Sequence, residues 1–431
     1  MSGDIYAIFA RRYNLIQPRK RRVSIPVVTL RRAWNGGADM RGEWRNLVWL
    51  TCAAMALATC AHASDAATDC SMEVAELRSQ AVIEPCSIAL QRTDLSREQR
   101  GLYLFIRGRG HHRSSRFELA QKDYDQALTL IEQNDELYLA RSNIAFRLGE
   151  WDDGLRLLNK ALEINPRNAH AWRAVASLYG DGGQPEQALH YYSKAIELDP
   201  TEAYAWLFRA RVYANLGKHA LALADIDALL RIDPMSLKRQ GFLSPQGDMR
   251  DFIAVALEER GEILESIGEF DRAEQDFNAA VARERSGYFL GSRARFLLAR
   301  NGRAEASLAD LDASIELAAD NPVTHYNRAV ALTTLERPDE AFAAVNSAIR
   351  INPQYARALL LRARMNRKRG DSEAATSDMI RAISNGGPSM LALTIPALQH
   401  AGYWRSPDVP TEITPELRDA VAACMLDESC N

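Results

Sequence analysis

Residues 169–202, AHAWRAVASLYGDGGQPEQALHYYSKAIELDPTE, decide the fold of this chain. Two stretches within them place apolar side chains at positions i, i+4 and i+7, a spacing that predicts two amphipathic helices. The two apolar sets are Trp172, Ala176 and Tyr179, followed by Ala188, Tyr192 and Ala195. Between them lies Gly183, which can adopt the positive φ that ends a helix, and Pro200 ends the second helix. The stretch therefore predicts a helix hairpin.

This hairpin recurs along the chain. Similar stretches end at Pro166, Pro200, Pro234 and Pro353, and the first three of these prolines are evenly spaced. In the frame that this spacing sets, repeats begin at residues 101, 135, 169 and 203 and, after an insertion, at 254, 288, 322 and 356. One hairpin has an apolar face too large to cover alone, and stacking of neighbouring repeats buries it. We therefore expect an all-α array of eight repeats.

The repeat resembles the tetratricopeptide repeat (TPR) family. The family pattern has Trp at position 4, a small residue at 8, Tyr at 11, Ala at 20, an aromatic residue at 24, Ala at 27 and Pro at 32. The repeat at 169 matches this pattern in full, whereas elsewhere Leu229 replaces an Ala, Glu132 replaces a Pro, and Arg295 stands at a small position. The resemblance implies a TPR solenoid, a right-handed superhelix of about eight helix hairpins.

Four repeats combine an Arg at position 7 with an Asp at position 23. These positions can face each other across two antiparallel helices, which would let a guanidinium and a carboxylate pair through two hydrogen bonds. Because the pairs recur evenly along the array instead of converging, we interpret them as structural. They are Arg107 with Asp123, Arg209 with Asp225, Arg260 with Asp276, and Arg362 with Asp378.

The repeats leave two terminal regions and one interruption. Before them we expect a basic segment that is disordered or not translated, a signal peptide and a helical N-terminal cap, at residues 1–39, 40–63 and 64–100. Repeats 1–4 occupy residues 101–236, an insertion follows at 237–253, and repeats 5–8 occupy 254–389. Residues 390–431 form a C-terminal helical cap, whose first role is to cover the apolar end of the last repeat.

Residues 40–63 have the features of a secretory signal. Arg41 and Arg45 precede an apolar run from Leu47 to Ala61, which leads into the small-residue pattern Ala61-His62-Ala63. The run is shorter than the roughly 18 residues needed to span a bilayer, so we expect cleavage after Ala63. The mature chain is then periplasmic or secreted.

Two alternatives stay open for this leader. Synthesis can begin at Met1 or at Met40, and the second start would account for the basic segment before it. The residues up to Cys60 resemble a lipoprotein processing site, except at Thr59. Lipidation at Cys60, or an uncleaved leader, would attach the chain to a membrane.

The mature chain is acidic and holds four cysteines. Removing residues 1–63 leaves 43 basic and 53 acidic residues, a balance that argues against a general nucleic-acid binder. The remaining Cys70, Cys86, Cys424 and Cys430 are even in number, which fits an oxidising compartment. Of the three possible pairings, 70 with 86 and 424 with 430 is favoured if the chain is elongated, because a disulfide requires Cα atoms within about 7 Å.

In TPR proteins, positions 2, 5, 9 and 12 of each first helix line a concave groove that grips extended peptides or partner helices. Here the resemblance implies a groove of interleaved cations and aromatic side chains in the first four repeats, suited to an acidic or carboxylate-bearing peptide. Its residues are Phe105, Arg109, His112, Asn143, Phe146, Arg173, Tyr204 and Arg211. The repeat at 254 carries an acidic stripe, Glu258, Glu262 and Glu265. Each set could equally be a solvated surface.

No sequence pattern points to catalysis. His111 and His112 are adjacent and so diverge on a helix, and no Cys or His cluster has metal-ligand spacing, so we expect neither a metal nor a cofactor. The tail segments LQHAGYW and PELRDAVAAC faintly resemble a peptidoglycan-binding helical module. The sequence thus predicts a non-catalytic scaffold that binds a protein or peptide partner. The alternative is a peptidoglycan-associated envelope protein, and a remote one is an enzyme with its site in the insertion or the tail.

Overall fold

The computed structural model describes residue 70 and residues 81–240, 242–243, 249–406, 410 and 412–427. The predicted basic segment and signal peptide, most of the predicted N-terminal cap before residue 81, Cys60 and Cys430 lie outside the described residues. The chain divides into two compact bodies, Met1–Met249 and Arg250–Asn431, called here the N-terminal and the C-terminal body.

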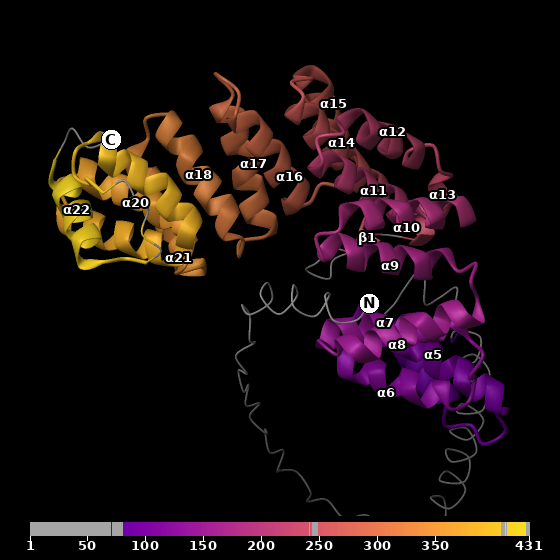
Figure 1. Cartoon of the computed structure of the whole chain (residues 1–431). Coiled ribbons are helices and arrows are strands. Elements are labelled where there is room, and N and C mark those ends of the chain that lie inside the picture. The colour runs from indigo at the N-terminus through magenta and orange to yellow at the C-terminus, as the bar shows by residue number, and fades with distance from the viewer. Residues whose placement is uncertain are drawn as a thin grey trace, which may run out of the picture. The chain divides into compact units, whose positions relative to one another are not determined.

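The N-terminal body is built from helix hairpins, in which α5 pairs with α6, α7 with α8, α9 with α10, and α11 with α12 (Figure 1). Its helices are α4 (Ile83–Ala89), α5 (Arg97–Arg113), α6 (Phe117–Leu128), α7 (Asp135–Leu148), α8 (Trp151–Ile164), α9 (Ala169–Asp181), α10 (Pro185–Leu198), α11 (Ala203–Asn215), α12 (His219–Leu229) and α13 (Pro234–Gln240). Each hairpin packs on the next through buried apolar side chains.

The C-terminal body repeats this construction, with α14 and α15, α16 and α17, α18 and α19, and α20 and α21 as its hairpins. Its helices are α14 (Phe252–Ser266), α15 (Phe270–Arg283), α16 (Gly287–Leu298), α17 (Ala304–Leu317), α18 (Pro322–Thr334), α19 (Pro338–Ile351), α20 (Ala356–Lys368), α21 (Ser372–His400) and α22 (Pro415–Leu426). The predicted all-α array of hairpins is confirmed. None of the helices in the described part of the chain has the length and apolar character needed to cross a bilayer.

The tail begins inside α21. Gly387 has φ 56, and Pro388 follows it, so the long helix is broken there into two segments. The first segment completes the hairpin with α20, and the second packs with α22 in one apolar cluster with the last hairpin, including Leu391, Ile395 and Leu417. The tail therefore buries the apolar face of the last repeat, which a solenoid end needs in order to stay soluble.

The predicted insertion contains most of α13 and two short strands, β1 (Phe242–Leu243) and β2 (Met249–Arg250), which pair in a two-stranded sheet. The side chains of residues 238–250 lie outside the described part of the structure.

Small residues at position 8 let the two helices of a hairpin approach closely. A Cβ on Gly108 would lie 2.5 Å from the ring of Tyr124, and one on Gly261 would lie 3.2 Å from the ring of Phe277. The assignment of Arg295 to this position was wrong. Ala294 is fully buried in its place and Arg295 is exposed, because the connection from α15 to α16 is one residue shorter than the connections from α8 to α9, α10 to α11, α17 to α18 and α19 to α20.

All four predicted arginine–aspartate pairs form inside their hairpins. Each guanidinium donates from Nε and Nη2 to the two carboxylate oxygens, at 2.6–2.8 Å. A fifth pair, Arg293 with Asp310, has the same geometry at 2.7 Å and was hidden by the register shift in α16. The five aspartates are between 3% and 8% exposed. A buried carboxylate is stable only when paired, so each pair fixes the position of two helices.

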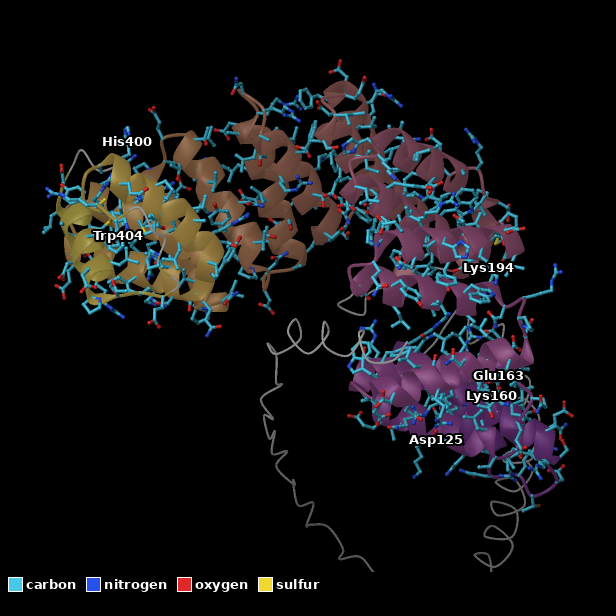
Figure 2. The ribbon with its side chains drawn as sticks, viewed as in Figure 1. Asp125, Lys160, Glu163, Lys194, His400 and Trp404 are labelled. Carbon is cyan, nitrogen blue, oxygen red and sulfur yellow. A yellow bond between two sulfur atoms is a disulfide. The ribbon has the colours of Figure 1, made fainter. Side chains whose placement is uncertain are left out.

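The position-7 arginines also connect one hairpin to the next. Arg209 donates from Nη1 to Ser193 of the preceding hairpin at 2.9 Å, and Arg362 donates likewise to Asn346 at 2.8 Å. Where position 23 is not Asp, the position-7 arginine pairs with an aspartate at position 25 of the preceding hairpin. Arg141 pairs in this way with Asp125, which is labelled in Figure 2, at 2.7 Å, and Arg328 pairs with Asp312 at 2.6 Å. We call this series the arginine ladder.

The ladder is interrupted between α8 and α9. Position 7 of α9 is Val175, position 25 of the preceding hairpin is Asn159, and Tyr191 replaces the position-23 aspartate. The ring of Tyr191 stacks between those of Trp172 and Tyr179, at centroid distances of 5.5 and 5.2 Å. The helices α8 and α9 pack more sparsely than the helices at the neighbouring junctions α6–α7 and α10–α11.

Restoring the missing rung should stabilise the N-terminal body. In the double variant Asn159→Asp with Val175→Arg, the new pair would copy the geometry of Asp125 with Arg141. We expect the change in the free energy of unfolding of the double variant to exceed the sum of the changes in the two single variants by about 1 kcal/mol. Chemical denaturation of the four proteins measures this coupling. A coupling energy of zero would contradict the role assigned to the ladder.

Candidate functional site

The predicted groove residues of the first repeat lie on α5, and one of them belongs to the core. Phe105 is 3% exposed and its ring lies 5.9 Å from that of Tyr124, so its assignment to an open groove was wrong. It faces inward because Gly108, one turn later, brings α6 close to this side of α5. The guanidinium carbon of Arg109 lies 5.9 Å from the centroid of the Phe105 ring.

On α7, Asn143 and Phe146 are half-buried. The ring of Phe146 stands over Gly154 of α8, where a Cβ would lie 2.4 Å from it, and its centroid is 5.5 Å from that of Trp151. Phe146 therefore holds α7 and α8 together and exposes only part of its ring.

Arg173 on α9 is bound to a carboxylate that sequence reasoning missed. Its Nε lies 2.6 Å from Glu202, and His170 Nδ1 lies 2.8 Å from the other oxygen. Glu202 is 1% exposed at the N-terminus of α11. Burial alone would raise the pKa of Glu202, but Arg173 and His170 hold it below its usual value. The hydrogen bond to Glu202 in turn raises the pKa of His170.

Removing the Arg173 guanidinium should destabilise the protein. In Arg173→Gln, Glu202 would stay buried with only His170 as a partner, and loss of one partner of a buried ion pair costs about 3 kcal/mol. Because the pKa of His170 is raised in the folded chain, its contribution is present at low pH and lost as pH rises through that value. Denaturant unfolding should therefore show the largest loss of stability of Arg173→Gln, relative to the wild type, above neutral pH. Equal stability of Arg173→Gln and the control Arg211→Gln at every pH would refute this.

Tyr204 and Arg211 on α11 belong to a column of alternating cations and rings. The guanidinium carbon of Arg173 lies 5.2 Å from the ring centroid of Tyr204, whose ring is 5.7 Å from that of Phe208. The guanidinium carbon of Arg211 lies 5.5 Å from the Phe208 ring. All four side chains are half-buried, so the column forms a stiff surface with accessible edges. We call Arg173, Tyr204, Phe208 and Arg211 the α9–α11 column.

The predicted acidic stripe of α14 is mostly used in packing against α16. Glu262 and Glu265 pair with Arg295 at 2.7 and 3.2 Å, and Glu265 also lies 3.6 Å from Arg300. Glu258 is 3% exposed, so its assignment to an open groove was wrong. The partners come from the next hairpin, where Arg295 is available because of the register shift in α16.

Glu258 is buried with hydroxyl groups as its hydrogen-bond donors. It accepts hydrogen bonds from the Tyr288 hydroxyl at 3.1 Å and the Ser292 hydroxyl at 2.8 Å. Burial and the neighbouring charges of Glu262 and Glu259 raise its pKa to about 7. The side chain is therefore held close to the point where it changes charge at neutral pH.

Glu258→Gln should make the protein less sensitive to pH. A carboxyl whose pKa is raised by folding lowers the free energy of unfolding as pH rises from its unfolded pKa of 4.5 to its folded value of about 7. We expect the wild type to lose on the order of 2 kcal/mol across this window relative to Glu258→Gln, whose amide oxygen can still accept both hydrogen bonds. Parallel stability profiles from pH 5 to pH 8 would contradict the assignment.

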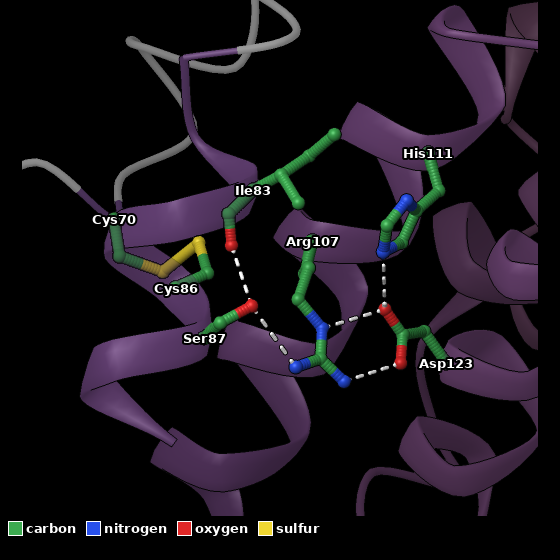
Figure 3. The surroundings of a disulfide bond; sticks show 7 residues. All are labelled: Cys70, Ile83, Cys86, Ser87, Arg107, His111 and Asp123. Atoms are coloured by element: carbon green, nitrogen blue, oxygen red, sulfur yellow. Dashed lines mark hydrogen bonds and ion pairs between the residues drawn. A yellow bond between two sulfur atoms is a disulfide. The ribbon is translucent and has the colours of Figure 1, made fainter. Parts of the chain in front are cut away.

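The cysteines lie near both ends of the described chain. Cys70 and Cys86 are joined by a disulfide, with their Cα atoms 4.8 Å apart (Figure 3). The neighbouring Ser87 accepts a hydrogen bond from Arg107 Nη1 at 3.2 Å, which ties α4 to the arginine ladder. Cys424 is disulfide-bonded, whereas the predicted partner Cys430 lies outside the described residues. Within the described residues, no three His, Cys, Asp or Glu side chains are placed to hold a metal.

Comparison with known families finds two matching models, both described as tetratricopeptide repeat. One matches residues 173–236 and 297–356, and the other matches residues 112–178. No curated protein matches the chain in sequence.

Several solved structures have a similar fold. The Cut9–Hcn1 hetero-tetramer of the APC/C is 15% identical with a TM-score of 0.49, over 71% of this chain and 56% of that one, so this chain spans about half of that protein. PilF from Pseudomonas aeruginosa is 16% identical with a TM-score of 0.44, over 53% of this chain and 97% of that one. YrrB, described as a TPR protein with an unusual peptide-binding site, is 22% identical with a TM-score of 0.33, over 47% of this chain and 95% of that one.

Proposed function

Because this chain is a tetratricopeptide repeat protein, we propose that it is a non-catalytic scaffold that binds a peptide or a partner protein along the first helices of its N-terminal hairpins. Such repeats support protein interaction in general. The finer proposal, that an acidic or carboxylate-bearing segment docks on α7, α9 and α11, rests on the contacts of this chain.

The α9–α11 column carries the proposal. Arginine and aromatic residues contribute most to affinity at protein interfaces, since they offer large rigid surfaces together with hydrogen-bond donors. Tyr204, Phe208 and Arg211 already contact one another, so little side-chain freedom is lost when a ligand docks. The half-buried Asn143 and Phe146 extend the same stripe to α7.

The chemistry of the stripe favours a negatively charged partner. Arg211 presents a guanidinium beside aromatic rings, a combination that suits a carboxylate attached to an apolar chain. Glu202, which would repel such a ligand, is buried and bound to Arg173 and His170. The corresponding stripe on α14 is acidic, and its Glu262 and Glu265 form ion pairs with Arg295. We therefore propose that the ligand binds to the N-terminal body.

We propose the periplasm or the exterior of the cell as the location. The apolar run before Ala63 has the pattern of a cleaved secretory leader. A disulfide between Cys70 and Cys86 would persist in such an oxidising compartment.

Arg211→Glu tests the docking surface. Cross-linked pull-down from a cell-envelope fraction should capture a partner with the wild-type chain, and we expect the yield to fall about tenfold with this variant. The matched control Arg231→Glu changes an exposed arginine outside the stripe and should leave the yield unchanged. Arg173 is unsuitable for this test because it stabilises Glu202. Equal capture by both variants would contradict the proposal, provided that their thermal stabilities agree.

A further inference from the structure

The start of α16 has little intrinsic stability. Gly287 and Gly291 lie in its first two turns, and glycine forms helices less readily than any residue except proline. Ser286 stands at the N-cap, yet its side chain caps no backbone amide, and its buried hydroxyl has no hydrogen-bond partner among the described residues. The first turn of α16 therefore depends on contacts with neighbouring helices.

Two contacts hold the inner side of this turn. Phe289 and Leu290 are each 1% exposed and anchor the turn in the apolar core. The Ser314 hydroxyl of α17 donates a hydrogen bond at 2.7 Å to the carbonyl oxygen of Gly287. None of these groups ionises, so this anchoring does not change with pH.

The side of the turn that faces α14 is held through a carboxyl group. The Tyr288 hydroxyl lies 3.1 Å from both oxygens of Glu258, and the Ser292 hydroxyl lies 2.8 Å from one of them. Tyr288 is 43% exposed, so its ring lies at the surface, whereas Glu258 is 3% exposed. This contact between α14 and the first turn of α16 thus depends on one buried, titratable group.

The charges around Glu258 oppose its ionisation. Glu259 and Glu262 stand on the same helix, and burial together with these two charges raises the pKa of Glu258 to about 7. Arg295 of α16 binds Glu262 at 2.7 Å and Glu265 at 3.2 Å, and Glu258 itself forms no ion pair within the described part of the structure. When Glu258 ionises, its charge is therefore balanced only by two neutral hydroxyl donors, an unfavourable arrangement for a buried carboxylate.

We propose that Glu258 is a pH-dependent latch on the first turn of α16. The protonated carboxyl group keeps Tyr288 and Ser292 against α14. Loss of its proton to solvent favours a state in which both side chains move away, the turn loosens and water reaches the carboxylate, while Phe289 and Leu290 stay in the core. This inference goes beyond the proposed function, because it concerns the C-terminal body and requires no ligand.

The size of the effect follows from the two ionisation equilibria. In the open state Glu258 is in water and has its ordinary pKa of 4.5, whereas in the closed state its pKa is about 7. A group that binds its proton more tightly in the closed state favours closing at low pH, and this preference is lost as pH rises from 4.5 to about 7. The equilibrium constant for opening should therefore rise roughly 50-fold between pH 5 and pH 8.

Hydrogen exchange, measured by mass spectrometry on the whole chain, tests the latch. After correction for the intrinsic pH dependence of exchange, the protection of the amides of residues 290–292 should fall roughly 50-fold from pH 5 to pH 8. In Glu258→Gln, which accepts the same hydrogen bonds without a charge, we expect their protection to change less than about twofold. The matched control Glu316→Gln removes an exposed carboxylate from α17 and should follow the wild type. Amides of α18 serve as the internal reference.

Two outcomes would overturn the proposal. If protection in α16 and in α18 falls in parallel with pH, Glu258 acts only on global unfolding and there is no local latch. If Glu258→Gln loses protection with pH as the wild type does, another group is responsible.

Tyr288→Phe tests the latch without changing the titratable group. It removes a hydrogen bond to α14 and keeps the ring, so at pH 5 the protection of residues 290–292 should fall about fivefold. The control Tyr326→Phe removes a hydroxyl from α18 of the same body and should leave that protection unchanged. Equal protection in both variants would show that Tyr288 does not hold the turn.

Discussion

The pairing of a position-7 arginine with an aspartate is the interaction on which the array depends. A guanidinium offers donors in two directions, and here Nε and Nη2 hold one aspartate of the hairpin while Nη1 reaches back to the hairpin before. The carboxylate can move from position 23 to position 25 of the preceding hairpin, as with Arg141 and Asp125, without loss of the pair. The arginines of the ladder therefore keep a carboxylate partner even where position 23 is not an aspartate. These pairs help to set the register in which the apolar face of each hairpin packs on the next.

Much of the fold could be predicted because its determinants lie within one repeat. Trp172, Ala176, Tyr192 and Ala195 specify both helices and their packing inside a single hairpin, and the partners of Arg209 and Arg362 lie 16 residues away in the sequence. The prediction failed at α16, because the connection from α15 to α16 is one residue shorter than most connections between repeats. That difference moved Ala294 into the position assigned to Arg295, and a fixed frame cannot detect it.

The site was harder to predict because its environment is supplied by the following hairpin. Arg173 is neutralised by Glu202, which stands at the start of α11, and Glu258 is covered by Tyr288 and Ser292 of α16. A position in a repeat indicates which face a side chain occupies but not whether the next repeat covers that face. Phe105 and Arg211 thus share the same predicted stripe, yet one is core and the other lies on the surface beside Phe208. Pairing and burial at Arg173 and Glu258 depend on residues about one repeat away in the sequence, whereas Phe105 is covered in part by Tyr124 of its own hairpin.

The interruption of the ladder has a mechanical consequence. At α8 and α9, Val175 and Asn159 leave the two hairpins joined by apolar packing that includes Leu158, Ala161 and Ala171, and by hydrogen bonds from Asn168 to Asp135 and Glu136 at one end. Two hairpins held by polar bonds at one end resist bending less than two hairpins that an ion pair of the arginine ladder also connects. We therefore expect this junction to bend more easily than the junctions α6–α7 and α10–α11. A ligand lying across α7 and α9 would adjust the width of its own binding surface there, while the hairpins on either side keep their shape.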